Sequence, residues 1–191
     1  SINKGPVTEN AKLITYHKSK KLIPIIENLM VKSDNLTAEL LIKTIGFEAN
    51  KKEGNWKNGL EEVRKFINDS VGIDTATFSI QDGSGVSRYN YGSPSQYIDL
   101  LKWVYNNKAI RDQFINTLPN STPKGVLNKR SLPNKVYAKT GSLSGVTTFS
   151  GYIFTNSGEI VAFSILMNGF KGDSLPYKNL QDKIVSALSM I

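Results

Sequence analysis

The stretch Tyr137–Val146, which reads Tyr-Ala-Lys-Thr-Gly-Ser-Leu-Ser-Gly-Val, determines how the rest of the chain is interpreted. Its first half falls within residues 135–142, a segment that reads as a β-strand. Two further strands are predicted at residues 147–154 and 160–167, and the turn-forming residues 155–158 join them as a hairpin. The sequence therefore predicts an antiparallel meander of three strands in its C-terminal half.

Helical patterns lie on both sides of this meander, because apolar side chains recur there at a spacing of three to four residues. Residues 75–80 alternate like a strand and run into the turn sequence Asp82-Gly83-Ser84-Gly85. Helices followed by a meander and a closing helix predict an α+β domain. Helices are expected at residues 22–30, 36–45, 56–70, from Ser93-Pro94 through Trp103 and Tyr105, at 109–118 and at 177–190, the last with Leu180, Ile184, Val185 and Leu188 on its buried face.

The length and charge of the chain restrict the class of protein. A chain of 191 residues with 39% hydrophobic side chains can bury one domain core. Twenty-four Lys and Arg against sixteen Asp and Glu give a net charge of +8, which would suit an anionic polymer. The lysines are scattered among Asn and Ser without a clustered basic face, so nucleic acid is not expected as a partner. No apolar run approaches the ~18 residues of a membrane span.

The chain contains no cysteine and a single histidine. Thiolate catalysis, disulfides and cysteine-based metal sites are therefore excluded. A Ser-His-Asp triad would depend entirely on His17, which precedes the first clear helix and is better explained as a structural histidine with satisfied hydrogen bonds. Any hydrolytic chemistry of this chain is expected to work without histidine.

Two short motifs carry the chemical information. Lys139-Thr140-Gly141-Ser142 lies in a predicted strand, and Ser33-Asp34-Asn35 lies in the link between two predicted helices. An isolated Ser-x-Asn near a helix start is usually only a helix cap. Ser-Asp-Asn followed downstream by Lys-Thr-Gly, however, gives two of the three elements that mark class A β-lactamases and penicillin-binding proteins, the third being Ser-x-x-Lys.

The residues around these motifs narrow the resemblance. With Asp82–Arg88, which reads Asp-Gly-Ser-Gly-Val-Ser-Arg, the chain from about His17 onward resembles the D-Ala-D-Ala carboxypeptidase/endopeptidases of the low-molecular-mass class C penicillin-binding proteins. Class A β-lactamases share the motifs, but the flanking residues favour the peptidase. The resemblance implies the transpeptidase fold of helices on an antiparallel sheet, no cofactor or metal, and a periplasmic or other extracytoplasmic location. It implies peptidoglycan stem peptides and β-lactam antibiotics as partners.

The resemblance also implies catalytic roles for three side chains. Without a triad histidine, lysines and a second hydroxyl can carry the proton that an attacking serine loses. Ser33 would be this hydroxyl and would pass the proton toward the leaving D-alanine nitrogen. Asn35 would orient the network and donate to the substrate's peptide carbonyl. Lys139 would supply positive charge near Ser33 and near the terminal carboxylate of the stem peptide.

The other residues of the strand motif would bind substrate. The hydroxyls of Thr140 and Ser142 would hold the terminal carboxylate, and the Ser142 backbone N–H would be one oxyanion donor. Gly141 would let the substrate approach the strand without a side chain in the way. The turn Asp82–Gly85 is interpreted as a structural turn that borders the cleft, because two glycines and an aspartate explain it fully.

The family's nucleophile belongs to a Ser-x-x-Lys motif that opens a helix. Ser1–Lys4 and Ser121–Lys124 fit the letters, but Gly5-Pro6 follows the first, and Pro123 and Gly125 flank the lysine of the second. Residues 1–191 are therefore predicted to be the C-terminal part of a longer peptidase, without the nucleophile segment and the inserted domains, and inactive alone. A non-catalytic peptidoglycan-binding relative, a class A-like β-lactamase and an unrelated basic domain remain as alternatives.

Overall fold

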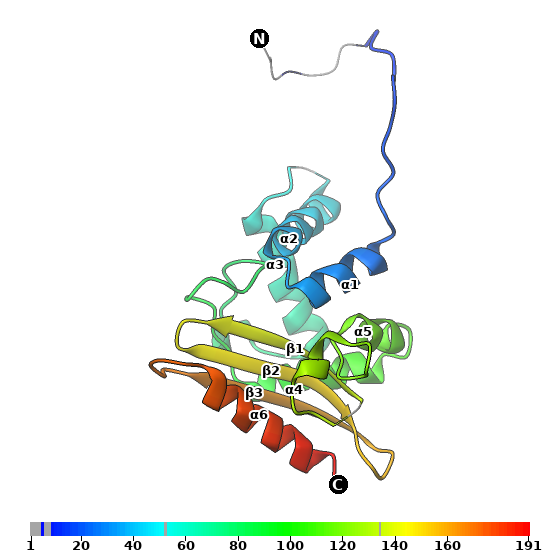
Figure 1. The fold of residues 1–191 in the computed structure, drawn as a ribbon. Coiled ribbons are helices and arrows are strands. Elements are labelled where there is room, and N and C mark those ends of the chain that lie inside the picture. Colours follow the sequence, from blue (N-terminus) through cyan, green and yellow to red (C-terminus); the bar gives the residue numbers. More distant parts are fainter. Residues whose placement is uncertain (1–4, 6–8, 52, 134) are drawn as a thin grey trace.

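The computed structural model of the chain describes residues 5, 9–51, 53–133 and 135–191, and within them it has an α+β fold (Figure 1). The helices and the three strands of the meander follow the order that the sequence predicts, and each of these strands lies within one residue of its predicted bounds. The helices are α1 (Leu22–Lys32), α2 (Asn35–Asn50), α3 (Trp56–Phe66), α4 (Pro94–Asn106), α5 (Arg111–Thr117) and α6 (Leu175–Leu188), and the strands are β1 (Val136–Leu143), β2 (Val146–Phe154) and β3 (Ile160–Asn168).

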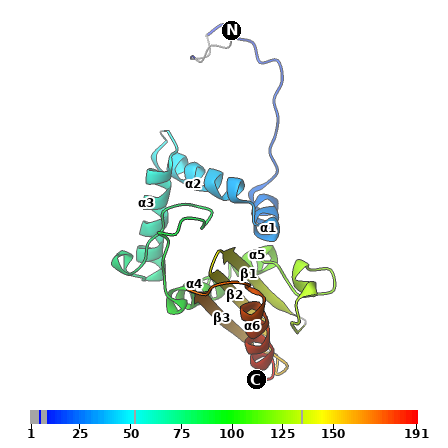
Figure 2. The ribbon, with the colours of Figure 1, turned by 60° about the vertical axis from the view of Figure 1, so that its left-hand side comes forward.

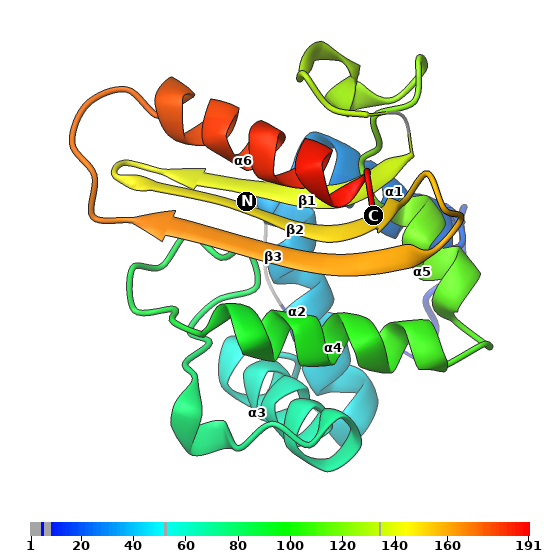
Figure 3. The same ribbon diagram turned by 90° about the horizontal axis from the view of Figure 1, so that it is seen from below.

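The three strands form one antiparallel sheet in the order β1-β2-β3, which confirms the predicted meander. In this register Lys139 lies opposite Ser150, and Ser150 lies opposite Ser164. Side chains alternate between the two faces of a sheet, so these three residues share one face. Figure 3 shows α6 along one side of the sheet and α4 along the other.

Each face of the sheet has its own core. On the α6 face, Val136, Phe149 and Phe163 pack with Val185 of the helix, and the first two strand residues are fully buried. On the opposite face, the buried Tyr152 packs with side chains of α4 and α5, and its hydroxyl donates to the Leu101 carbonyl oxygen at 2.6 Å. Burial raises the pKa of the Tyr152 phenol. Because side chains of the sheet are buried on both of its faces, strand β1, which carries Lys139, is held in a fixed position.

Helices α2 and α3 are consecutive and cross one another beside the sheet (Figure 2). Their backbones touch at two glycines. A Cβ on Gly59 would lie 2.0 Å from the Ile42 carbonyl oxygen, and a Cβ on Gly46 would lie 2.8 Å from the Gly59 nitrogen. The Asn55 side chain caps the start of α3 by accepting from the Asn58 N–H at 3.0 Å. Only glycine permits this close crossing of the two helices.

Two predictions about secondary structure are wrong. The strand expected at residues 75–80 is a 3-10 turn, Thr75–Thr77, followed by a single bridge between Ser79 and Tyr91. The Asp74 side chain accepts from the Ala76 N–H at 2.9 Å, and this cap favours the turn over an extended chain. Helix α3 also ends at Phe66 and continues as a short π-helical segment, Ile67–Val71, instead of remaining α-helical to residue 70.

The buried face of α6 also differs from the prediction. Leu180 and Ile184 are 49% and 38% exposed, whereas Gln181 and Asp182 are buried beside Val185. The reason is Arg130, which pairs with Asp182 at 2.6 Å and donates to the Gln181 side chain at 3.1 Å. This polar cluster rotates the helix so that its predicted apolar stripe lies partly in solvent.

Residues 9–21, which precede α1, form an extended segment that leaves the body of the protein (Figure 1). His17 lies in this segment and is exposed, with no hydrogen-bond partner among the residues described. The prediction that it is a satisfied structural histidine is therefore wrong. None of the helices in the described part of the chain is both long and apolar enough to traverse a bilayer.

Candidate active site

The Ser-Asp-Asn motif occupies the junction of α1 and α2. Asp34 is the N-cap of α2, and its carboxylate accepts from the Leu36 N–H at 3.1 Å and from the Thr37 hydroxyl at 2.6 Å. The hydrogen bond from the Thr37 side chain is the main cause of a lowered pKa at Asp34. The cap fixes the two flanking residues, Ser33 at the end of α1 and Asn35 in the first turn of α2.

Ser33 has an unusual backbone conformation. Its φ of 52° and ψ of 49° lie in the left-handed region, which disfavours a side chain by about 1 kcal/mol. Strained backbone of this kind is found preferentially at functional sites. Here the conformation ends α1 and allows Asp34 to begin α2 immediately, so the Ser33 hydroxyl is presented at a corner between two helices.

Lys139 of β1 reaches this corner. Its Nζ donates to the Ser33 hydroxyl and, at 2.8 Å, to the Thr140 carbonyl oxygen. The side chain is half-buried, and burial lowers the pKa of the ammonium group. Residues separated by more than a hundred positions in the sequence therefore meet, as the resemblance implied. Asn35 is exposed beside them, and no hydrogen bond of its side chain is found within the described residues.

The other motif residues lie further along the same strand. Thr140 and Ser142 alternate with Lys139 and belong to the α6 face of the sheet, opposite Phe149 and Thr147. Their hydroxyls have no hydrogen-bond partner among the described residues. A Cβ on Gly141 would lie 2.4 Å from the Thr148 hydroxyl, so a larger residue here would require the Thr148 side chain to move.

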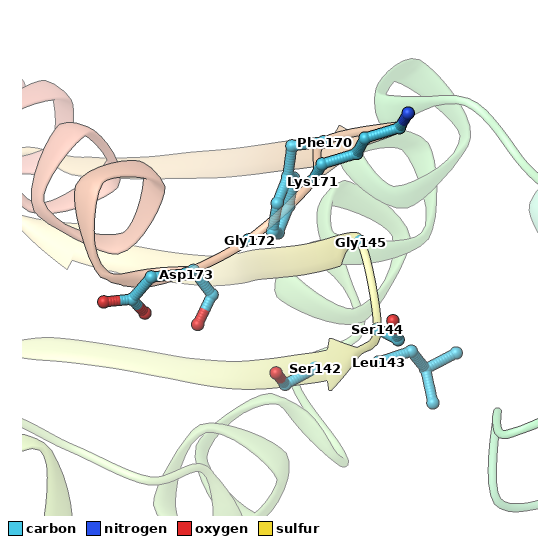
Figure 4. A pocket seen from close by; sticks show the side chains of 9 residues that line it. Ser142, Leu143, Ser144, Gly145, Phe170, Lys171, Gly172 and Asp173 are labelled. Carbon is cyan, nitrogen blue, oxygen red and sulfur yellow. The ribbon is translucent and has the colours of Figure 1, made fainter.

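Ser142 also lines an open pocket of about 670 Å³ at the end of the sheet. One wall is Ser142–Gly145, and the other is Phe170–Ser174, the segment between β3 and α6 (Figure 4). Phe170 is held by stacking on Tyr177, with ring centroids 4.0 Å apart. No sequence motif reveals this second wall, because Phe170–Ser174 carries no recognisable pattern and meets Ser142 only through the fold.

The Asp82–Gly85 segment is a turn, as predicted, and it borders the site. Asp82 accepts from the backbone N–H groups of Gly85 at 2.7 Å and Ser87 at 2.6 Å. Arg88 follows the turn and donates to the Ser144 carbonyl oxygen at 3.1 Å. This contact links the turn to the connection between β1 and β2, immediately after the Lys-Thr-Gly-Ser motif.

The structure also bears on the two candidate nucleophile motifs. Ser121 is buried and does not open a helix, and its hydroxyl donates to the Pro133 carbonyl oxygen at 2.6 Å and accepts from the Val136 N–H at 3.0 Å. These contacts give Ser121 a structural role, in agreement with the sequence analysis. The other candidate, Ser1–Lys4, lies outside the described residues.

An α+β fold in which a Ser-x-Asn corner meets a Lys-Thr-Gly strand defines the class of penicillin-binding and β-lactamase-like proteins. The model of the D-Ala-D-Ala carboxypeptidase 3 (S13) family matches residues 1–190. The chain therefore belongs to this family.

Relatives of known sequence and structure agree with this assignment. The D-alanyl-D-alanine carboxypeptidase DacB of Haemophilus influenzae is 29% identical over 183 residues, which are 93% of this chain and 38% of the relative. A crystal structure of penicillin-binding protein 4 from the same organism, in complex with a β-lactam, superposes with a TM-score of 0.78 at 26% identity, covering 88% of this chain and 41% of that one. A β-lactamase from Chitinophaga pinensis shares the fold, with a TM-score of 0.69 at 20% identity over 89% of this chain and 64% of the β-lactamase.

Proposed function

We propose that this chain forms one part of the active site of a serine D,D-peptidase, which cleaves D-Ala-D-Ala termini or peptide cross-links of peptidoglycan through an acyl-enzyme. The observation that carries the proposal is the hydrogen bond between the Lys139 ammonium and the Ser33 hydroxyl. Both groups belong to motifs of the family, and they come from different elements of the fold. A helix cap alone would not require a half-buried lysine beside Ser33.

The chemistry follows from this pair. A lysine that shares a hydrogen bond with a serine hydroxyl can hold that hydroxyl ready to give a proton to a leaving amine and to take one back. The lowered pKa of Lys139 supports such a role, since it brings proton transfer closer to neutral pH. The same positive charge would attract the terminal carboxylate of the stem peptide, for which Thr140 and Ser142 would supply hydroxyl donors. Asn35 would hold the substrate's peptide carbonyl.

We assign the nucleophile to a part of the protein outside residues 1–191. The chain spans about two-fifths of the length of its Haemophilus influenzae relative, and Ser121 is engaged in structural hydrogen bonds. The isolated chain would then bind substrate weakly and form no acyl-enzyme. Because the substrate lies in the cell wall, we further propose a periplasmic or other extracytoplasmic location.

Labelling by a fluorescent penicillin tests this proposal. The longer protein is expected to become covalently labelled, and the isolated chain of 191 residues is expected to remain unlabelled at the same concentration. Peptide mapping of the labelled protein should identify a serine outside this chain. Labelling of any serine within residues 1–191 would contradict the assignment of the nucleophile.

A second candidate is a non-catalytic relative that binds peptidoglycan. The observation that favours it is that no Ser-x-x-Lys opens a helix within the described residues. The same experiment separates the two functions. A non-catalytic relative would bind stem peptides reversibly, and even its longest natural form would resist covalent labelling.

A further inference from the structure

The carboxylate of Glu39 lies at a junction of three segments. Its Oε2 accepts from the Trp56 indole N–H at 2.7 Å and from the Gly83 N–H at 3.1 Å, and its Oε1 accepts from the Ser84 N–H at 3.0 Å. Glu39 belongs to α2, one helical turn after Asn35. Burial alone would raise the pKa of Glu39, but the hydrogen bonds from Ser84, Gly83 and Trp56 outweigh it and lower this pKa.

The turn that Glu39 holds is seated directly on α2. A Cβ on Gly83 would lie 2.5 Å from the Ile42 side chain and 2.7 Å from the Ala38 carbonyl oxygen. The turn therefore touches the helix without an intervening side chain. A charge-assisted pair of hydrogen bonds to two successive backbone N–H groups fixes its orientation as well as its distance.

The far end of this segment contacts the sheet. Asp82 organises the turn through the N–H groups of Gly85 and Ser87, and it also accepts from the Asn90 side chain at 2.9 Å. Arg88 then donates to the Ser144 carbonyl oxygen. A continuous series of hydrogen bonds thus runs from α2 through the turn to the β1–β2 connection. In Figure 2 the segment between α3 and α4 passes between the crossing helices α2 and α3 and the sheet.

We propose that Glu39 is a positioning residue of the candidate active site: by holding the Asp82–Arg88 segment against α2, it sets the separation between Asn35 and the strand end that follows Ser142. This inference rests on the proposed function, because it assigns Glu39 to the geometry of that cleft. The substrate peptide would lie between these two walls. Glu39 itself does not contact the substrate.

Nuclear magnetic resonance of the 191-residue chain tests the coupling. Glu39→Gln keeps the volume of the side chain but removes its charge and one acceptor oxygen, so the amide signals of Gly83 and Ser84 should shift. If Glu39 positions the strand end, the amides of Ser144 and Gly145 should shift with them. Glu48→Gln is the matched control, because Glu48 is exposed on the same helix and, among the described residues, pairs with Lys51 alone.

Acid titration gives a second readout that does not depend on a variant. When Glu39 becomes protonated, the amides near both ends of the segment should titrate together. Several other charged side chains lie on the packed elements. The carboxylates are Glu48, Glu61, Glu62 and Asp82, and the cations are Lys43, Lys57, Arg64, Lys65 and Arg88. A response to acid that persists in Glu39→Gln belongs to one of these other carboxylates and not to Glu39.

Peptide binding connects the coupling to function. Titration with N-acetyl-D-Ala-D-Ala should move the amides of β1 in the wild-type chain, and Glu39→Gln should weaken this binding about fivefold or more, whereas Glu48→Gln should not. Absence of binding to the wild-type chain would count against the proposed function but would leave the coupling result intact. The positioning role is overturned if Gly83 and Ser84 respond to Glu39→Gln or to acid while Ser144 and Gly145 do not.

Discussion

The two regions that meet at Lys139 and Ser33 are built differently. The sheet buries residues on both faces, and Phe149 and Ile153 of its central strand are fully inaccessible. In contrast, α1 has no buried residue, and Gly46 is the only buried residue of α2. The strand that carries Lys139 is therefore held by packing, whereas Ser33 and Asn35 are held by caps, close glycine contacts and hydrogen bonds.

This difference predicts which of the two regions will move when a single contact is removed by substitution. A wall fixed by apolar packing tolerates the loss of one hydrogen bond, because the remaining contacts keep its geometry. A wall fixed by a few polar contacts can move when one of them is lost. We therefore expect substitutions in the sheet to reduce the stability of the protein, and substitutions around α2 to alter the site at almost constant stability.

The largest expected effect is on the sheet core. Phe149→Ala should lower the free energy of unfolding by about 3–5 kcal/mol, because it removes a fully buried ring that contacts Phe163. Leu40→Ala in α2 should cost less than about 1 kcal/mol, because Leu40 is 54% exposed. Urea denaturation of the isolated chain measures both. Equal losses would show that α2 is packed as tightly as the sheet.

The next effect concerns the ion pair that orients α6. Arg130→Ala should lower the free energy of unfolding by about 3 kcal/mol, because it leaves the nearly buried Asp182 carboxylate without its partner. Arg111→Ala is the control, since it removes an arginine from an exposed pair with Asp112 and should leave the stability almost unchanged. If both variants unfold at the same denaturant concentration, the buried ion pair contributes no more to the stability of the protein than the other one.

A third prediction compares Lys139 with His17 in the longer protein. Lys139→Ala should slow acylation by penicillin and by peptide about thirty- to a thousandfold, as expected for loss of a charge-assisted hydrogen bond in a partly desolvated cleft. Lys139→Arg keeps the charge but misplaces it and should recover only part of the rate. His17→Ala should change the rate only a few-fold, because His17 is exposed on the extended segment. If folded His17→Ala were as slow as Lys139→Ala, the lysine mechanism would be wrong.

Much of the fold could be predicted because the relevant signals are local. Three extended segments, the last two joined by the turn residues 155–158, predicted the strands of the meander. Ser93-Pro94 predicted the start of α4, where the full capping box forms with Gln96. The buried face of α6 could not be predicted in this way. It depends on Arg130, which is distant in sequence and brings Gln181 and Asp182 inward.

The same distinction applies to the site. Ser33 and Lys139 could be named because both belong to recognisable motifs, and the structure brings their side chains into contact. Glu39 was overlooked, since a glutamate within a helix gives no signal until its partners Trp56, Gly83 and Ser84 are known. Gly141 was interpreted through the substrate alone, although a Cβ there would also press against the Thr148 side chain of the neighbouring strand.

The proposed chemistry depends on the contact between Lys139 and Ser33, which can be examined by titrating the Lys139 side chain with nuclear magnetic resonance. The pKa should lie below the ordinary lysine value of about 10.4, because burial disfavours the charged form. The unfolded chain then binds more protons at alkaline pH, so stability should rise with pH from the folded-state pKa up to the ordinary value. Ser33→Ala should shift the Lys139 side-chain signals. A pKa at or above the ordinary value, with signals unaffected by Ser33→Ala, would contradict the proposed pairing.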